Sequence, residues 1–176
     1  MTDRKIRLAT VWLDGCSGCH MSLLDTDERL IEVAKRVDVV WGPLVDHKEF
    51  PADVDVTLVE GAISSVEDLH RIKVVRERTG ILVSLGDCAV TGNVPAMRNR
   101  FGAGAVLRRA YLENETLDAQ IPRQVIPELL PMARPVHEVV PVDVFVPGCP
   151  PSADLIFSVL SDLLEGKRPI PAAIFG

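Results

Sequence analysis

Short apolar runs, most of them rich in valine, recur along the chain between more polar stretches. Continuous apolar runs of this kind are typical of strands that are buried on both faces of a parallel sheet. We therefore predict strands at Ile6–Leu13, Val37–Trp41, Val54–Val59, Ile81–Leu85 and Val142–Val146.

Between these runs, apolar residues recur at the three- and four-residue spacing of amphipathic helices. The predicted helical faces consist of Leu24, Leu30, Ile31 and Ala34, then Val66, Leu69, Ile72 and Val75, and finally Leu155, Ile156, Val159, Leu160 and Leu163. Ser64 and Glu67 have the spacing of a capping box at the start of the second helix. The alternation of strands and helices predicts an α/β fold with a doubly wound parallel sheet.

The region from about residue 91 to 141 interrupts this alternation, since it has little periodicity and contains prolines at positions 95, 122, 127, 131, 135 and 141. We interpret it as an irregular insertion of loops and short helices before the last strand. Long irregular segments in compact domains are often functional, so a partner interface and a solvated loop remain equal alternatives. The whole chain, residues 1–176, is predicted to be a single domain.

The charge of the chain argues against a nucleic-acid partner, because a formal net charge of −6 repels phosphate backbones. The first residues, MTDRKIRLATVW, contain no apolar export segment. No stretch of about 20 apolar residues predicts a membrane span. These features predict a cytoplasmic protein without a membrane partner.

The four cysteines stand just after predicted strands: Cys16 and Cys19 in DGCSGCH, Cys88 in LGDCAVTG and Cys149 in VPGCPPS. Open parallel sheets bind ligands beyond the carboxyl ends of their strands, so three loops would bring these thiols to one edge. The neighbouring glycines, which allow positive φ and close backbone approach, are Gly15, Gly18, Gly86 and Gly148. Thiolates in such loops favour an iron–sulfur cluster.

Two alternatives remain open for the cysteines. A zinc ion held by four thiolates would have no redox role, although structural zinc sites usually combine two closely spaced pairs of ligands. A thioredoxin-like dithiol at Cys16 and Cys19 would leave Cys88 and Cys149 without a function. The placement of all four cysteines after strands favours the cluster over both.

The runs DGCSGC, VEGAI, GDCAVTGN and VPGCPPS together resemble the small subunits of nickel–iron hydrogenases over nearly the whole chain. This resemblance implies a flavodoxin-like domain with one [4Fe–4S] cluster ligated by Cys16, Cys19, Cys88 and Cys149. It also implies a large-subunit partner that holds the nickel–iron site, to which the cluster would be proximal. The chain itself would relay single electrons, and no catalytic residue is expected in it.

The sequence contains neither the twin-arginine leader nor the additional cluster domain of respiratory hydrogenases, so it looks like the small subunit of cytoplasmic NAD-reducing enzymes. That likeness implies diaphorase subunits carrying FMN and further iron–sulfur clusters. The alternative is the homologous quinone-side subunit of respiratory complex I, but that family has adjacent cysteines where this chain has Ser17 and Gly18 between them. A second flavin in this chain is left open, although the cysteine loop occupies the usual position of a flavodoxin phosphate loop.

Three other polar residues lie close to the cysteine motifs. Glu60 in VEGAI and Asp87 beside Cys88 are candidates for supporting the cluster or a partner cation, although either carboxylate could simply be solvated. His20 follows Cys19 directly, and a hydrogen-bonded histidine with no special role is the simpler interpretation. No P-loop, dinucleotide fingerprint or nucleophilic triad accompanies them.

Overall fold

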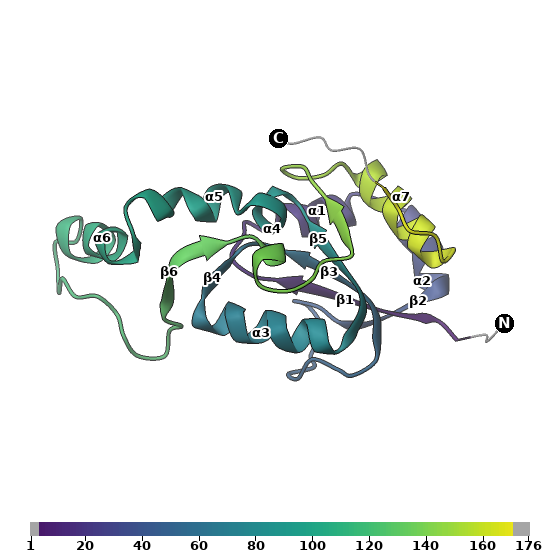
Figure 1. The fold of residues 1–176 in the computed structure, drawn as a ribbon, viewed down its shortest axis with the longest axis horizontal. Helices are drawn as coiled ribbons and strands as arrows, with labels where there is room; N and C mark the ends of the chain where they lie inside the picture. The colour runs from purple at the N-terminus through teal and green to yellow at the C-terminus, as the bar shows by residue number, and fades with distance from the viewer. Residues whose placement is uncertain (1–3, 171–176) are drawn as a thin grey trace.

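The computed structural model describes residues 4–170, and its centre is a five-stranded parallel sheet (Figure 1). Neighbouring strands follow the order β2-β1-β3-β5-β7 and every pair is parallel. Counted along the chain, this is the 2-1-3-4-5 order of flavodoxin. The strands are β1 Ile6–Trp12, β2 Val37–Trp41, β3 Val54–Glu60, β5 Thr79–Leu85 and β7 Val144–Val146. The predicted flavodoxin-like α/β fold is confirmed.

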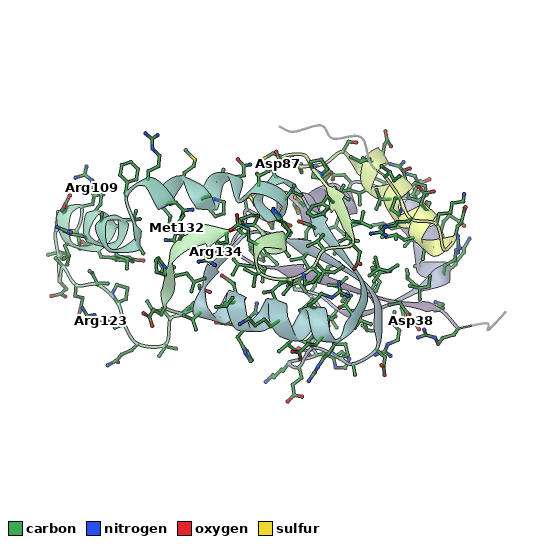
Figure 2. The ribbon with its side chains drawn as sticks, viewed as in Figure 1. Asp38, Asp87, Arg109, Arg123, Met132 and Arg134 are labelled. Carbon is green, nitrogen blue, oxygen red and sulfur yellow. The ribbon has the colours of Figure 1, made fainter. Side chains whose placement is uncertain are left out.

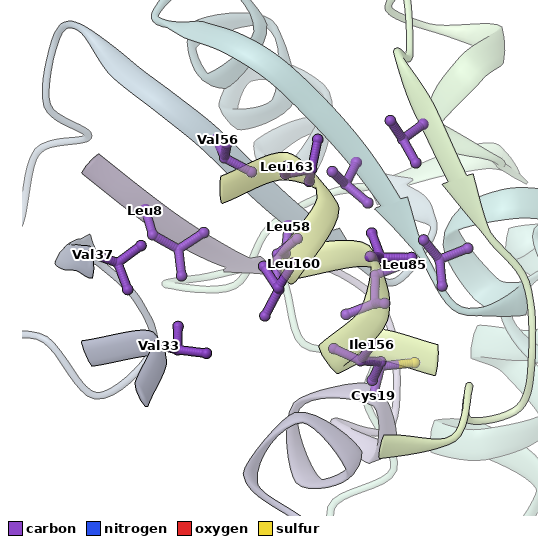
Figure 3. Close-up of a cluster of buried hydrophobic side chains, with 14 residues drawn as sticks. Leu8, Cys19, Val33, Val37, Val56, Leu58, Leu85, Ile156, Leu160 and Leu163 are labelled. Carbon is purple, nitrogen blue, oxygen red and sulfur yellow. The ribbon is translucent and has the colours of Figure 1, made fainter. Parts of the chain in front are cut away.

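Helices cover both faces of the sheet, so the strands are buried on two sides. On one face lie α1 Gly18–Leu24, α2 Arg29–Arg36 and α7 Ala153–Leu164, and on the other lies α3 Val66–Glu77. Figure 3 shows the first core, in which Leu8 and Leu58 of the sheet meet Leu160 of α7. Among residues 4–170, no helix is long and apolar enough to cross a membrane.

The burial pattern explains why the strands appear as continuous apolar runs in the sequence. Successive side chains of a strand point to opposite faces. Leu58 of β3 belongs to the core beneath α7, whereas Val59 belongs to the core beneath α3, and both are almost completely buried. Both positions must therefore be apolar.

The first predicted helix is wrong in one respect, because the structure divides it into α1 and α2. Thr26 is buried and its hydroxyl donates to Leu23 O at 2.7 Å, while Asp27 has a φ of 51°, which stops the helix. The predicted apolar face is consequently wrong as well. Leu24 and Ile31 are exposed, and Val33 is the residue of α2 that enters the core.

The capping box at the start of α3 lies one residue later than predicted. Ser65 is the N-cap and accepts from Asp68 N at 3.1 Å, while the Asp68 carboxylate accepts from Ser65 N at 2.9 Å. Both serines belong to a short strand, β4 Ile63–Ser65, and α3 begins directly after it at Val66. The sequence offers two overlapping serine-to-acid pairs, and the pair that starts at the last residue of the strand forms the cap.

The region from 91 to 141 is more regular than predicted. Its antiparallel strand β6 pairs with β4, and neither strand was predicted, because prolines flank β6 and Pro131 interrupts it. Residues 93–134, called the arm below, extend away from the central sheet (Figure 1). The elements from the end of β5 to β7 are α4 Asp87–Thr91, α5 Asn93–Ala96, the 3₁₀ helix η1 Met97–Arg100, α6 Ala103–Arg108, the π-helical turn η2 Arg109–Glu113, β6 Leu129–Arg134 and the 3₁₀ helix η3 Val136–Glu138.

Asp143, just before β7, links α3 to the sheet. Its carboxylate accepts from Arg76 Nη1 at 2.7 Å and from Leu82 N at 2.8 Å. Burial opposes ionisation, but these hydrogen bonds and the Arg76 charge together hold the pKa of the Asp143 carboxyl below its usual value.

The lowered pKa of Asp143 predicts a pH-dependent contribution to stability. The carboxyl is harder to protonate in the folded chain, so its contribution is present above its unfolded pKa of about 4 and is lost as pH falls through the folded value. We expect Asp143→Asn to lower the unfolding free energy by about 1 kcal/mol at pH 7 and by much less near pH 2. Urea denaturation midpoints at both pH values measure this difference.

Asp154→Asn is the matched control, since it also removes an arginine-paired carboxylate, at 2.7 Å from Arg29 Nη1, but one that is 87% exposed. It should change the midpoint at pH 7 less than Asp143→Asn does. An Asp143→Asn effect of equal size at both pH values would contradict the prediction.

Candidate iron–sulfur site

The first cysteine loop leaves the carboxyl end of β1 and is held on both sides. Trp12 Nε1 donates to Gly15 O at 2.9 Å. The backbones of Asp14 and Ala62 exchange hydrogen bonds of 3.1 and 2.8 Å, which tie the loop to the segment after β3. Cys16 follows this fixed point and is exposed. Its position therefore depends on backbone pairing between two neighbouring strand ends.

Cys19 lies in the first turn of α1 and faces the second cysteine loop. The thiol is buried, and its Sγ lies only 2.2 Å from the point where a Cβ at residue 86 would be. Gly86 also has a φ of 82°, which favours glycine. The close approach of these two loops therefore requires a residue without a side chain at position 86.

Asp87 joins the second cysteine loop to the third. Its backbone N–H donates to Gly148 O at 2.9 Å, and its Oδ1 accepts from Gly148 N at 2.7 Å. The carboxylate is buried, at 4% exposure. Ser22 of α1 donates its hydroxyl hydrogen to Pro151 O at 2.5 Å, which also ties the first loop to the third. The three loops are thus connected directly to one another.

The electrostatics of Cys19 place all four thiols in one neighbourhood. Burial raises the pKa of the Cys19 thiol, and negative charge at Glu60, Cys88, Cys16 and Cys149 raises it further. These effects agree with the contacts between the three loops, which bring together the four cysteines that the sequence singled out.

Two donors on the segment after α4 point at cysteine sulfurs. Asn93 Nδ2 donates to Cys149 Sγ at 3.5 Å. Burial raises the pKa of Cys88, while a hydrogen bond from the Val94 backbone acts in the opposite direction. Neither donor was predicted from the sequence, although Asn93 ends the run GDCAVTGN. Both would bind a thiolate more strongly than a thiol.

Glu60 supports the first turn of α1. Its side chain is 2% exposed, and its Oε2 accepts from His20 N at 3.0 Å and pairs with His20 Nδ1. His20 Nε2 is buried and has no hydrogen-bond partner among the described residues. Glu60 and Asp87 are therefore not solvated carboxylates, because each holds the backbone of a segment that carries a cysteine.

These residues fit an iron–sulfur cluster. The donor set consists of thiols alone, and a coordinated metal would offset the burial and the nearby negative charge that raise the pKa of Cys19. The missing side chain at Gly86 leaves space beside Cys19 Sγ, and Asn93 and Val94 supply hydrogen bonds to sulfur. Among residues 4–170, no three cysteine, histidine or carboxylate side chains are arranged as ligands of one ion.

A protein-family model and a solved structure both match the part of the chain that carries the four cysteines. The model of the family "NADH ubiquinone oxidoreductase, 20 Kd subunit" matches residues 16–163, a stretch that includes all four cysteines. The chain is 38% identical to a chain in the crystal structure of an NAD⁺-reducing [NiFe]-hydrogenase in the H₂-reduced state. That match has a TM-score of 0.91 and covers 96% of both chains.

Two relatives come from hydrogenases of different organisms. The chain is 43% identical to the delta subunit of the NAD-reducing hydrogenase HoxS of Cupriavidus necator, covering 94% of this chain and 81% of the relative. It is 36% identical to one of the subunits of the F420-non-reducing hydrogenase vhu of Methanocaldococcus jannaschii, covering 96% of this chain but only 59% of the relative. The predicted resemblance to hydrogenase small subunits is confirmed, and the chain belongs to the NADH ubiquinone oxidoreductase 20 kDa subunit family.

Proposed function

We propose that this chain is the electron-transfer small subunit of a nickel–iron hydrogenase and holds one [4Fe–4S] cluster on Cys16, Cys19, Cys88 and Cys149. The observation that carries the proposal is the direct connection of the three loops that hold these four thiols at the carboxyl ends of β1, β5 and β7. The bound cluster would accept and release one electron at a time. The identity with hydrogenase subunits over nearly the whole chain supports this function.

The residues around the thiols would fix the position of the cluster and influence its potential. Asp87 keeps the Cys88 and Cys149 loops in register, and Glu60 holds the turn that carries Cys19. Asn93 Nδ2 and the Val94 backbone donate toward sulfur. These are the contacts by which a protein tunes a cluster, whereas the chemistry of hydrogen belongs to another subunit.

The proposed assembly contains a large subunit with the nickel–iron site and diaphorase subunits with FMN and further iron–sulfur clusters. Two of the proposed ligands, Cys16 and Cys149, are exposed in the isolated chain, as expected if a partner covers this edge. The relative from Cupriavidus necator and the similar solved structure are both named NAD-reducing, which supports NAD as the final acceptor. We place the assembly in the cytoplasm.

The complex I alternative draws support from the family description alone, because the family model is named after that enzyme. The relatives and the solved structure reported above are hydrogenases, and this favours the hydrogenase over a quinone-linked subunit. The zinc alternative predicts a metal without sulfide. Metal analysis therefore distinguishes it directly from the cluster.

Anaerobic purification of the native complex tests the proposed function. Iron, sulfide, nickel and zinc are quantified, the subunits are identified, and hydrogen-dependent NAD reduction is assayed. About four irons and four sulfides assigned to this chain, with nickel in a partner, would support the proposal. Zinc without sulfide would overturn the cluster, and a cluster in a complex without nickel would favour the complex I alternative.

Replacing Asn93 by glycine tests its contact with Cys149. Glycine tolerates the positive φ of 28° at this position, so the change removes the side-chain amide with little backbone strain. A hydrogen bond to sulfur stabilises the more negative, reduced state, so its loss should lower the reduction potential of the cluster. We expect a decrease on the order of 40 mV, the one-electron equivalent of about 1 kcal/mol, in a redox titration followed by EPR.

Asn114→Gly is the matched control for this change, because Asn114 is exposed and lies in the arm, beyond the cysteine loops. It should leave the potential unchanged. An unchanged potential in Asn93→Gly would show that the amide does not act on the bound cluster, and a higher potential would contradict the expected stabilisation of the reduced state.

A further inference from the structure

The arm, residues 93–134, differs in charge from the rest of the chain. It contains six arginines, four acidic residues and no lysine, a balance of +2 in a chain whose net charge is −6. Figure 2 shows Arg123, Met132 and Arg134 on this part of the molecule. The arm therefore has a net positive charge, while the remainder of the chain has a net negative charge.

The arginines of the arm also differ in their partners. In residues 4–170, every arginine outside the arm donates to a carboxylate or a carbonyl oxygen, as Arg29 does to Asp154 and Arg36 to Leu164 O. Within the described chain, the arginines whose side chains form no ion pair or hydrogen bond all lie on the arm. They are Arg100, Arg108, Arg123 and Arg134, and all four are exposed.

Large apolar side chains lie exposed among these arginines. Phe101 is 71% exposed, Leu117 is 79% exposed, and Val94, Met97, Val125 and Met132 are each at least half exposed. Enrichment in aromatic residues, methionine and arginine, together with a lack of lysine, is the composition of a protein–protein interface. A merely solvated loop would not need this apolar surface.

The base of the arm is anchored, so the surface is held in place before any partner binds. Arg98 donates to Ser64 O and Leu130 O, both at 3.0 Å. The side-chain amide of Asn99 and the backbone of Ala133 exchange two hydrogen bonds of 2.8 Å. Preorganisation of this kind reduces the conformational entropy lost on binding.

We propose that the arm is a docking surface for a partner subunit that presents carboxylates around an apolar patch. Guanidinium groups form bidentate pairs with carboxylates, and the exposed apolar side chains would fill the space between these pairs. A nucleic acid is disfavoured because the rest of the chain is acidic. The inference rests on the proposed function only in that the partner is taken to be another subunit of the same hydrogenase.

The test uses the whole complex, co-expressed with its own subunits. Arg100→Gln/Arg123→Gln removes two unpaired charges. Lys48→Gln/Lys73→Gln is the control, since both lysines are exposed, lie outside the arm and have side chains that form no ion pair or hydrogen bond within residues 4–170. Subunit dissociation is followed by native mass spectrometry across a salt series. We expect the arm variant to bind one subunit at least about tenfold more weakly, with a shallower salt dependence, while the control matches the wild type.

A second variant, Phe101→Ser/Leu117→Ser, tests the apolar part of the surface without changing charge and should weaken the same subunit. Both variants should keep the iron and sulfide content of the wild type, because the arm carries none of the proposed ligands. Wild-type affinity for every subunit in both arm variants would overturn the docking surface. Variants that lose bound RNA but keep every subunit would overturn it as well. A wild-type chain without a cluster would instead overturn the proposed function.

Discussion

Replacing Gly86 by alanine is expected to abolish cluster binding although the cysteines are untouched. The new Cβ would lie 2.2 Å from Cys19 Sγ, far inside van der Waals contact. Neither Gly86 nor Cys19 can easily move away. Gly86 N is fixed to Val146 O by a hydrogen bond of 2.7 Å, and Cys19 lies in the first turn of α1. The thiol would have to leave its position in the site. Iron and sulfide analysis and the visible absorption spectrum measure the loss.

The substitution should also destabilise the fold. Gly86 has a φ of 82° and a ψ of 160°, a conformation essentially restricted to glycine, so an alanine there is strained by about 1–3 kcal/mol, and overpacking adds roughly 1–3 kcal/mol. Gly104→Ala is the matched control, because nothing lies within 4 Å of its added Cβ. In the double variant Gly86→Ala/Cys19→Ala the clash with sulfur is gone, so part of the stability should return while the cluster stays absent. A full cluster in Gly86→Ala would contradict the geometry of the site.

The central sheet was predictable from the sequence because its strands are buried on both faces. Each of the predicted apolar runs overlaps an observed strand, and α7 buries the face that its periodicity predicts. The short elements were harder to predict from the sequence. The periodicity around Leu24 and Ile31 resembles one helix, but Asp27 adopts a positive φ and divides it. The β4–β6 pair is defined by contacts between distant segments, which local patterns do not contain.

The sequence predicted which loops come together to form the cysteine site. The rule that ligands gather beyond the carboxyl ends of parallel strands was sufficient to bring Cys88 and Cys149 together. The expectation for the glycines was only partly correct, since Gly86 and Gly148 have positive φ, whereas in the first loop it is Ser17, at 64°, that adopts this conformation. Which glycine makes the closest approach depends on tertiary packing.

The roles of the polar residues near the cysteines could not be derived from sequence. Glu60 and Asp87 were noted as candidates because of their position, but their partners, His20 N and Gly148 N, lie 40 and 61 residues away along the chain. The hydrogen bond from Asn93 to Cys149 spans 56 residues. Such contacts require the fold, because the intervening chain gives no local signal that the two groups meet.

Replacing Cys149 by serine is expected to remove or severely deplete the cluster while leaving the fold almost intact. Serine offers a harder and more weakly binding oxygen in place of a thiolate. Cys149 is exposed, so the change creates no buried cavity, and we expect the unfolding free energy without the cluster to change by no more than about 0.5 kcal/mol. Iron, sulfide and EPR measurements on the anaerobically purified complex report the cluster, and urea denaturation reports the fold.

Two related variants distinguish metal ligation by Cys149 from the effect of the hydrogen bond to its sulfur. Cys149→Ala has no oxygen ligand and should lose at least as much iron as the serine variant. Asn93→Gly removes only the 3.5 Å contact to Cys149 Sγ and should keep the full iron content with a shifted potential. If Cys149 is a ligand, Cys149→Ala and Cys149→Ser should be depleted in iron, whereas Asn93→Gly should keep its full iron content. Full iron and sulfide with an unchanged spectrum in Cys149→Ala would exclude it from the ligand set, because the sequence offers no further cysteine to take its place.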